Sequence, residues 1–311
     1  MNVILCGFHW TGCKALEILR AHNVNVYVYT HLTPWHIPSL PEYCERENIP
    51  YTTEKIEINN LPFQPDVICS IYYRYIISKE VIDVVNGKIF NLHPSLLPKY
   101  RGCSSVTWAL INNEKKYGYT YHFIEPTCDT GNIILQKALL IEPWDTQQSL
   151  FYKVMFESMK DFFDVLIRVL DGETGAPQTG ESSFYLRGCP HDGKINDKWS
   201  LEYIERFIRA MYFPPYPCAT YKDREIHSMQ EYLKISTTPP PLKIFISLIN
   251  SINIISPNVY LGNALTLGKG NFIGHNAVLD HYVKLGIIQL LIMVPFLIMY
   301  VKLKILLWRK L

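Results

Sequence analysis

Residues 91–102 read Asn91-Leu-His-Pro-Ser-Leu-Leu-Pro-Lys-Tyr-Arg-Gly102, and residues 129–131 read Asp129-Thr-Gly131. The side-chain amide of Asn91 is suited to hydrogen-bonding an oxyanion, and the imidazole of His93 is suited to accepting a proton. A carboxylate at Asp129 is suited to orienting a water molecule or the histidine. The pattern therefore predicts an enzyme that catalyses acyl transfer, with Asn91, His93 and Asp129 as its catalytic residues.

The chain before this motif alternates short apolar runs with helical spacing. The runs predict strands over 2–6, 25–29, 67–71 and 87–91, and helices over 13–20 and 79–85. The fourth strand ends at the motif, and open parallel sheets bind ligands at the carboxyl ends of their strands. The order predicts an α/β fold with a mostly parallel sheet.

The segment Gly7-Phe-His-Trp-Thr-Gly12 forms the first turn between a predicted strand and a predicted helix. Its glycines have two interpretations. They either cradle a phosphate at the helix N-terminus, or they serve only the geometry of the turn. Trp10 and Thr11 would form a lip for a substrate in either case.

After residue 131, apolar runs predict a pair of strands over 133–136 and 138–141. Thr146 is a predicted N-cap for a helix over 147–170, and a further helix contains Trp199 and Met211. Cys128 precedes Asp129 directly, and we expect it to be a small buried hydrophobic residue more than a nucleophile.

The amino-acid composition indicates which partners the protein can have and in which cellular compartment it is expected. The 311 residues include 30 basic and 28 acidic ones, for a net charge of +2, which argues against nucleic acid as a partner. Eight cysteines occur without a Cys-x-x-Cys pair, which predicts a reducing cytoplasm. The chain also lacks a His-x-x-x-His pair, so no metal is expected at the site.

The motif of residues 91–102 and 129–131 resembles that of the formyltransferases that use N10-formyltetrahydrofolate. The resemblance covers residues 1–234 and implies a Rossmann-like domain with N10-formyltetrahydrofolate as co-substrate. It implies that the loop over 70–78 surrounds the pterin. The residues that would line this folate pocket are Tyr73, Tyr75, Ile76 and Ile77. Arg74 differs from the small residue of the members that act on transfer RNA, which points to another substrate.

The segments 206–215 and 219–221 resemble the branch of this family that acts on nucleotide-linked amino sugars. The resemblance implies an acceptor such as a dTDP-linked 4-amino-4,6-dideoxyglucose, used for surface polysaccharide such as lipopolysaccharide O-antigen, and a homodimer is expected. The expected substrate contacts are Trp10, Thr11, Arg101 and Tyr221, and Arg206 or Arg209 would face a diphosphate. The alternatives are a formyltransferase for methionyl-tRNA or a purine precursor, and an inactive binding protein anchored to a membrane.

The sequence after residue 234 predicts a different organisation. Residues 235–254 form a proline-containing linker. From 255 to 286 an aliphatic residue recurs every six positions, which predicts a short, incomplete left-handed β-helix of hexapeptide repeats that resembles those of acyltransferases. Residues 287–311 are an apolar tail, which we interpret as the product of a frameshift or, less favoured, as a membrane segment over 287–301.

Overall fold

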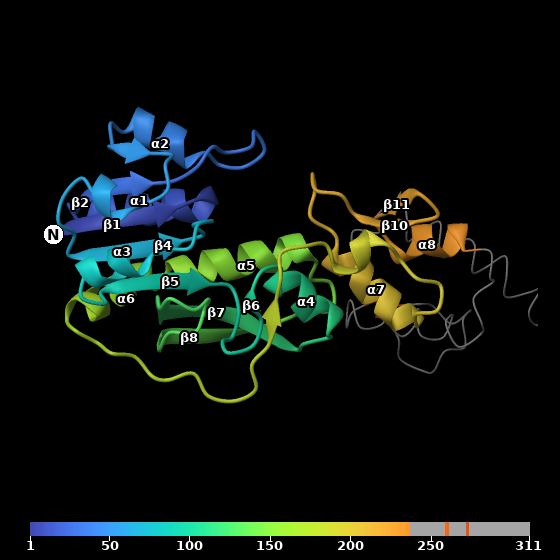
Figure 1. Cartoon of the computed structure of the whole chain (residues 1–311). Helices are drawn as coiled ribbons and strands as arrows, with labels where there is room; N and C mark the ends of the chain where they lie inside the picture. Colours follow the sequence, from blue (N-terminus) through green and yellow to red (C-terminus); the bar gives the residue numbers. More distant parts are fainter. Residues whose placement is uncertain (237–258, 261–271, 274–311) are drawn as a thin grey trace, which may run out of the picture. The chain divides into compact units, whose positions relative to one another are not determined.

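The computed structural model describes residues 1–236, 259–260 and 272–273. The chain divides into two compact units, Met1–Pro239 and Pro240–Leu311. All the residues expected to act in catalysis or binding lie in the first unit, whose helices and strands are labelled in Figure 1.

A seven-stranded sheet forms the centre of the first unit, in the order β3-β2-β1-β4-β5-β7-β8. The first five strands in this order pair in parallel, whereas β7 and β8 run antiparallel to their neighbours. The prediction of an α/β fold with a mostly parallel sheet is therefore confirmed. The strands are β1 (Asn2–Gly7), β2 (Asn25–Tyr29), β3 (Tyr51–Thr52), β4 (Val67–Ile71), β5 (Ile89–His93), β7 (Lys116–Phe123) and β8 (Ile133–Leu140).

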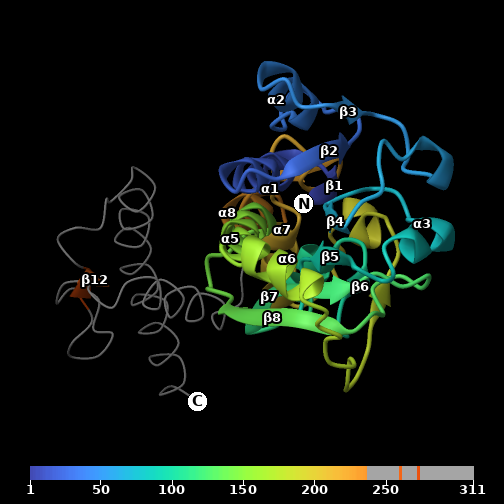
Figure 2. The ribbon, with the colours of Figure 1, turned by 90° about the vertical axis from the view of Figure 1, so that its left-hand side faces the viewer.

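Helices cover both faces of the sheet (Figure 2). Side chains alternate between the faces of a strand, so Val3 and Leu5 of β1 join one core while Ile4 and Cys6 join the other. The first core lies under α1 (His9–Ala21), α5 (Gln147–Met159) and α6 (Phe162–Leu170). The second, smaller core lies under α3 (Lys79–Val84). Burial on both faces explains why the parallel strands are continuously apolar.

Smaller elements complete the unit. A parallel pair joins β6 (Arg101–Gly102) to β9 (Phe184–Tyr185), and a hairpin joins β10 (Ala219–Tyr221) to β11 (Arg224–Ile226). The remaining helices are α2 (Leu40–Arg46), α4 (Ser105–Ile111), which packs against α7 (Leu201–Ala210), and α8 (Met229–Ile235), with short 3-10 turns η1 (Ile58–Asn60) and η2 (Pro190–Gly193).

The structure corrects two of the predicted elements after residue 131. The predicted pair of strands over 133–141 is the single strand β8, because β8 is at the edge of the sheet and Lys137 can turn outward to Asp161. The predicted helix over 147–170 is two helices, α5 and α6. The chain turns between them at Asp161, whose carboxylate accepts the hydroxyl of Tyr119.

The first helix also differs from prediction, because α1 begins at His9 instead of residue 13. The two glycines at its start allow the close approach of strand and helix. A Cβ atom on Gly12 would lie 3.1 Å from the carbonyl carbon of Gly7. Close packing between β1 and α1 is therefore enough to explain both glycines. Phosphate binding at this turn remains a prediction.

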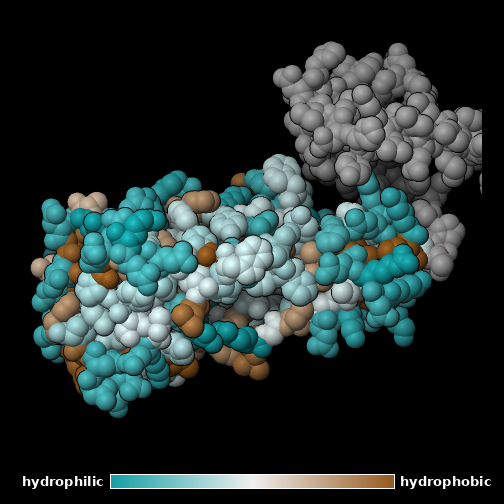
Figure 3. Space-filling view, turned by 90° about the horizontal axis from the view of Figure 1, so that it is seen from above, coloured by the Kyte–Doolittle hydropathy of each residue, from teal (hydrophilic) through white to brown (hydrophobic). Residues whose placement is uncertain are grey.

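The surface seen from above is mixed, with hydrophobic side chains scattered among hydrophilic ones (Figure 3). No helix in the described part of the chain has both the length and the hydropathy needed to cross a bilayer. Beyond residue 236 the structure describes one antiparallel pair, β12 (Val259–Tyr260) with β13 (Phe272–Ile273). The predicted linker, most of the predicted β-helix and the apolar tail lie outside the described residues.

Candidate active site

The structure brings the three predicted catalytic residues together at the carboxyl end of β5. Asn91 and His93 point to the same face of this strand, and Asp129 lies in the connection between β7 and β8. Nδ1 of His93 is 3.6 Å from Oδ2 of Asp129. A fourth residue, His122 on β7, lies opposite Asn91 and places Nε2 3.6 Å from Oδ1 of Asp129. The two histidines and the aspartate therefore form one cluster with Asn91.

The hydrogen bonds around Asn91 fix the orientation of its amide. Nδ1 of His122 lies 2.8 Å from the carbonyl oxygen of Phe123, which can only accept, so this nitrogen carries the proton. Nε2 of a neutral His122 is then an acceptor, and Nδ2 of Asn91 donates to it at 3.2 Å. Oδ1 of Asn91 accepts the hydroxyl of Ser70 at 2.9 Å. This leaves the second N–H of Asn91 as a donor for an oxyanion.

The same reasoning assigns the proton of His93. Its Nε2 is 2.8 Å from the carbonyl oxygen of Tyr100, so Nε2 carries the hydrogen. The lone pair of a neutral His93 is therefore on Nδ1, which faces Asp129. Burial lowers the pKa of His93 below 6.5, although the negative charge of Asp129 opposes this effect. His93 is neutral at pH 7, and Nδ1 can accept a proton beside a carboxylate.

Asp129 is held in the ionised form. Burial raises its pKa, but the neighbouring imidazoles of His93 and His122 and the hydrogen bond from the Gly102 amide lower the pKa more strongly, to well below 3.8. The Gly102 amide donates to Oδ2 at 2.8 Å. An ionised Asp129 would therefore stabilise an imidazolium formed at His93.

Cys128 is neither buried nor a thiolate, which corrects the expectation that it is a buried hydrophobic residue. Its Sγ donates to Oδ2 of Asp129 at 3.3 Å. Partial burial and the neighbouring negative charge raise the pKa of the thiol to about 12. A protonated thiol is a poor nucleophile, so Cys128 does not compete with the cluster for the role of catalyst.

Gln178 ties the catalytic loop to Arg101. Its side-chain amide donates to the carbonyl oxygens of Asp129 and Gly131, each at 2.9 Å. Its Oε1 accepts two N–H groups of Arg101, at 2.6 and 3.2 Å. Arg101, an expected substrate contact, therefore lies beside the catalytic loop and helps to hold it. Contact of Arg101 with a substrate remains a prediction.

Sequence reasoning missed His122, Ser70 and Gln178. His122 was missed because the strand that carries it was not predicted. The signal was present, since Tyr117, Tyr119 and Tyr121 alternate with small or polar residues, as expected of a strand with one buried face. Ser70 and Gln178 carry no local pattern that separates them from other polar residues.

The four expected folate contacts have different environments. Ile77 is 4% exposed and packs in the core under α3, whereas Ile76 is 74% exposed. The hydroxyl of Tyr73 accepts the backbone N–H of Ile56 at 3.0 Å. The ring of Tyr75 lies 5.3 Å from the guanidinium of Arg74. The side chains of Ile76 and Tyr75 are therefore accessible to a ligand, whereas that of Ile77 is buried. The assignment of this loop to the folate stays a prediction.

The expected substrate contacts Trp10, Thr11 and Tyr221 also differ in their exposure and position. The ring of Trp10 is partly exposed and packs edge-on against Phe156. Thr11 is fully buried, and its hydroxyl donates to the carbonyl of Phe8, because it lies in the first turn of α1 and faces inward. Thr11 therefore forms no lip. Tyr221 is 7% exposed in the β10–β11 hairpin, which lies apart from β5 in Figure 1.

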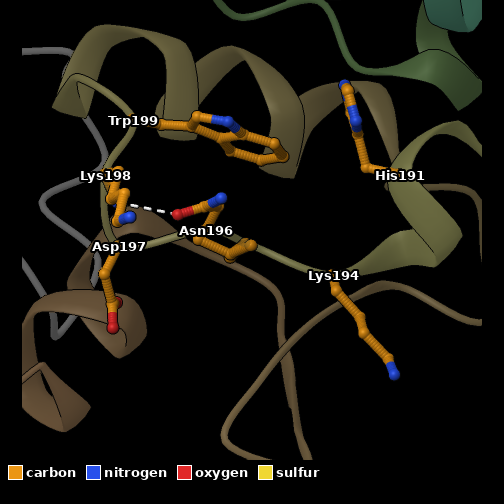
Figure 4. Close-up of a pocket in the computed structure, with 7 residues that line it drawn as sticks. His191, Lys194, Asn196, Asp197, Lys198 and Trp199 are labelled. Atoms are coloured by element: carbon orange, nitrogen blue, oxygen red, sulfur yellow. Dashed lines mark hydrogen bonds between the residues drawn. The ribbon is translucent and has the colours of Figure 1, made fainter.

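A surface hollow of about 500 Å³ lies before α7 and contains none of the catalytic residues. Its lining includes Lys194, Asn196 and Trp199, and Oδ1 of Asn196 accepts the Lys198 amide (Figure 4). Because the cluster at β5 brings together a carboxylate, a base and an amide, we assign the chemistry to that cluster and not to the hollow. Within the described residues no group of three His, Cys, Asp or Glu side chains is placed to hold a metal ion.

The family of the chain follows from comparison with known proteins. A family model described as formyl transferase matches residues 42–166. A GDP-perosamine N-formyltransferase from Brucella melitensis is 41% identical over 202 residues, which are 63% of this chain and 78% of that protein.

Solved structures show the same fold. The N-formyltransferase from Helicobacter canadensis, in complex with folinic acid and dTDP-3-aminofucose, is 26% identical with a TM-score of 0.62 over 73% of this chain and 86% of that chain. The sugar 3N-formyl transferase WlaRD, determined in the presence of dTDP and 5-N-formyl-THF, is 24% identical with a TM-score of 0.63 over 73% and 85%. Since the relative from Brucella melitensis is similar over more than two thirds of its length, the chain is a formyltransferase and belongs to the formyl transferase family.

Proposed function

We propose that the protein transfers the formyl group of N10-formyltetrahydrofolate to the amine of a nucleotide-linked aminodeoxy sugar. One observation carries this proposal: an unused N–H of Asn91 and the lone pair of His93 Nδ1 lie at the same end of β5. An acyl transfer to an amine needs one donor for an oxyanion and one acceptor for a proton. The cluster supplies both.

The residues would act in sequence on a bound formyl donor and a bound amine. As the amine nitrogen bonds to the formyl carbon, the remaining N–H of Asn91 donates to the oxygen, which gains negative charge. His93 accepts at Nδ1 the proton that the attacking nitrogen loses, and Asp129 stabilises the imidazolium. Breakage of the bond to N10 then restores the carbonyl, and N10 gains a proton. Tetrahydrofolate and the formamide are the products.

The relatives support the class of acceptor. The protein from Brucella melitensis is named for GDP-perosamine, and the structure from Helicobacter canadensis contains dTDP-3-aminofucose. At 41% identity the first relative favours a GDP-linked sugar over the dTDP-linked sugar that the sequence pattern suggested. Use of the product for surface polysaccharide, a cytoplasmic location and a homodimer stay predictions.

The proposal can be tested with a panel of GDP- and dTDP-linked aminosugars. Each is incubated with N10-formyltetrahydrofolate and the protein, and mass spectrometry follows the gain of one formyl group. We expect a GDP-linked aminosugar to be formylated fastest. Formylation of methionyl-tRNA or a purine precursor, with no reaction of any aminosugar, would contradict the proposal.

A further inference from the structure

A group of buried polar atoms near β1 and β2 has no partner within the protein. Among the described residues, the buried side-chain nitrogen and oxygen atoms without a hydrogen bond are His9 Nδ1, Thr30 Oγ1, His31 Nδ1 and both ring nitrogens of His36. Buried polar groups are almost always paired, so each exception needs an explanation. Here the exceptions share one region, since all of them lie in the segments that follow β1 and β2, before α2.

This region is the carboxyl edge of the same parallel sheet that carries the catalytic cluster. In the strand order β2-β1-β4-β5, the end of β2 is three strand spacings from the end of β5, roughly 14 Å. Ligands of open α/β sheets bind along this edge. A diphosphate and two sugar rings separate the amine of a nucleotide-linked sugar from its base, which suits a span of this order.

Aromatic rings surround the unpartnered histidines. The ring of His31 stacks on Phe8 with centroids 3.9 Å apart. His36 lies between two rings, with Trp35 at 5.4 Å and Tyr216 at 5.3 Å between centroids. Tyr216 comes from the segment before β10, which approaches the loop after β2 in Figure 1. Two distant parts of the chain therefore meet at His36.

The loop after β2 is arranged with its apolar side chains outward. Leu32 is 82% exposed and Trp35 is 91% exposed, while the imidazoles of His31 and His36 have buried nitrogens. Proteins ordinarily bury indole rings and leave polar groups to water. A ligand that formed hydrogen bonds with the imidazoles and was covered by Trp35 would give the buried nitrogens their missing partners and would cover the exposed indole ring.

The pKa values of His9 and His31 indicate what kind of ligand fits. Burial lowers the pKa of His9 to about 4, with a further contribution from His36, and burial followed by Arg74 lowers the pKa of His31 to about 4. Both rings are therefore uncharged at pH 7, and each offers one N–H donor and one acceptor. Such groups complement the donor and acceptor edge of a nucleobase, whereas a diphosphate would favour cations.

We propose that His31, His36 and Trp35 form the subsite for the nucleobase of the nucleotide-linked substrate, with the imidazoles bonded to the edge of the base and Trp35 stacked on its face. The inference rests on the proposed function, because it takes the substrate to be a nucleotide-linked sugar. It assigns a role to residues that lie outside the catalytic cluster.

The test is calorimetric titration of the full chain with GDP, dTDP and pyrophosphate, without folate. We expect one nucleotide to bind, and Trp35→Ala and His36→Leu each to weaken that binding about tenfold or more, the first by loss of stacking on the base and the second by loss of a hydrogen bond to its edge. The affinity for pyrophosphate should not change. Trp35 is almost fully exposed, so its substitution does not threaten the fold.

Two control variants separate a local effect from a general one. His22→Gln changes a histidine at the other end of α1, about 20 Å from His9, and Trp144→Ala changes a second exposed tryptophan. Both should bind the nucleotide as the wild type does. Nucleotide binding that survives Trp35→Ala and His36→Leu overturns the subsite, as does an equal loss of pyrophosphate binding. Nucleotide binding that depends on Trp35, together with no formylation of any aminosugar, would support the subsite and contradict the proposed reaction.

Discussion

The amide of Asn91 can be used for catalysis because its neighbours have already determined which way it faces. His122 accepts a hydrogen bond from one N–H of the Asn91 amide, and Ser70 donates to the amide oxygen. The second N–H of Asn91 therefore remains available to a substrate. His93 is similarly fixed by the carbonyl of Tyr100, which keeps the lone pair on Nδ1. In each side chain, the hydrogen bonds that neighbouring residues make with the other polar atoms therefore determine the orientation of the reactive atom.

The three residues proposed for catalysis should each be needed for turnover. Asn91→Ala, His93→Ala and Asp129→Asn should lower kcat roughly a hundredfold or more, the size expected for loss of an oxyanion donor or a base. Steady-state kinetics with the best aminosugar of the panel would measure this. Cys128→Ala is the control, and we expect it to keep most of the activity. Near wild-type kcat in folded His93→Ala would refute the assignment.

The dependence of the rate on pH should follow His93. Its neutral form accepts the proton, so kcat/KM should fall as the pH drops through its pKa, which burial places below 6.5. The charge of Asp129 raises this pKa, so Asp129→Asn should lower it further and move the acid limb to lower pH. A pH–rate profile of both proteins is the measurement. A limb that stays in place or moves upward would be inconsistent with this role for Asp129.

Ser70 and His122 should affect catalysis mainly by orienting the amide of Asn91. His122→Phe or Ser70→Ala frees the amide to rotate and should lower kcat about tenfold, with a smaller effect on KM. The same changes in the Asn91→Ala background should have little further effect, because residues in one network are not additive. Full additivity in this double-mutant cycle would mean that His122 acts independently of Asn91.

At the scale of secondary structure, the sequence predicts the elements before the motif better than those after it. The buried parallel strands read as plain apolar runs, and β2 and β4 have the predicted bounds, whereas β5 spans Ile89–His93 and not the predicted 87–91. The edge strand β8 tolerates Lys137 in its middle, so its apolar pattern was interrupted and suggested two strands. The predicted helix over 147–170 is interrupted next to Asp161, whose carboxylate accepts a hydrogen bond from Tyr119 on a distant strand, a contact that no local pattern reveals.

The connection between β7 and β8 should depend on Gly131. A Cβ atom there would lie 2.0 Å from the carbonyl oxygen of Phe123, so Gly131→Ala must displace the loop that carries Asp129. We expect a loss of stability of about 1–3 kcal/mol and a large loss of kcat. Gly188→Ala is a matched control, because its Cβ meets nothing within 4 Å. Urea unfolding and kinetics would be measured on both, and unchanged values for Gly131→Ala would contradict the packing described.

At the scale of the whole molecule, the residues that act in the site belong to one unit with its own core. The unit Met1–Pro239 contains the sheet, both cores and the catalytic cluster. The sequence predicted Asn91, His93 and Asp129 of this cluster because the two segments 91–102 and 129–131 together resemble a family motif. The unpartnered histidines 9, 31 and 36 were not predicted as a group, because the burial of their ring nitrogens arises only in the folded chain.

A chain that ends after Pro239 should fold and transfer formyl groups as the full chain does. Its core is complete within these residues, so its kcat should agree within about twofold and its thermal midpoint within a few degrees. Calorimetry and kinetics on the two proteins side by side test this. A shortened chain that folds but is inactive would show that residues beyond 239 contribute to the reaction.

The Gln178 bridge has a consequence for protein engineering. The long connection between α6 and β9 runs along the outside of the unit in Figure 1 and looks like a convenient place to insert a tag. Its middle holds the catalytic loop through Gln178, and its end holds Tyr100 through Ser183. Extra residues after Gly180, between these two attachments, would leave both in place, since lengthening a flexible loop costs little. Shortening the same segment would draw Asp129 away from His93, so this connection can accept fusion partners but not deletions.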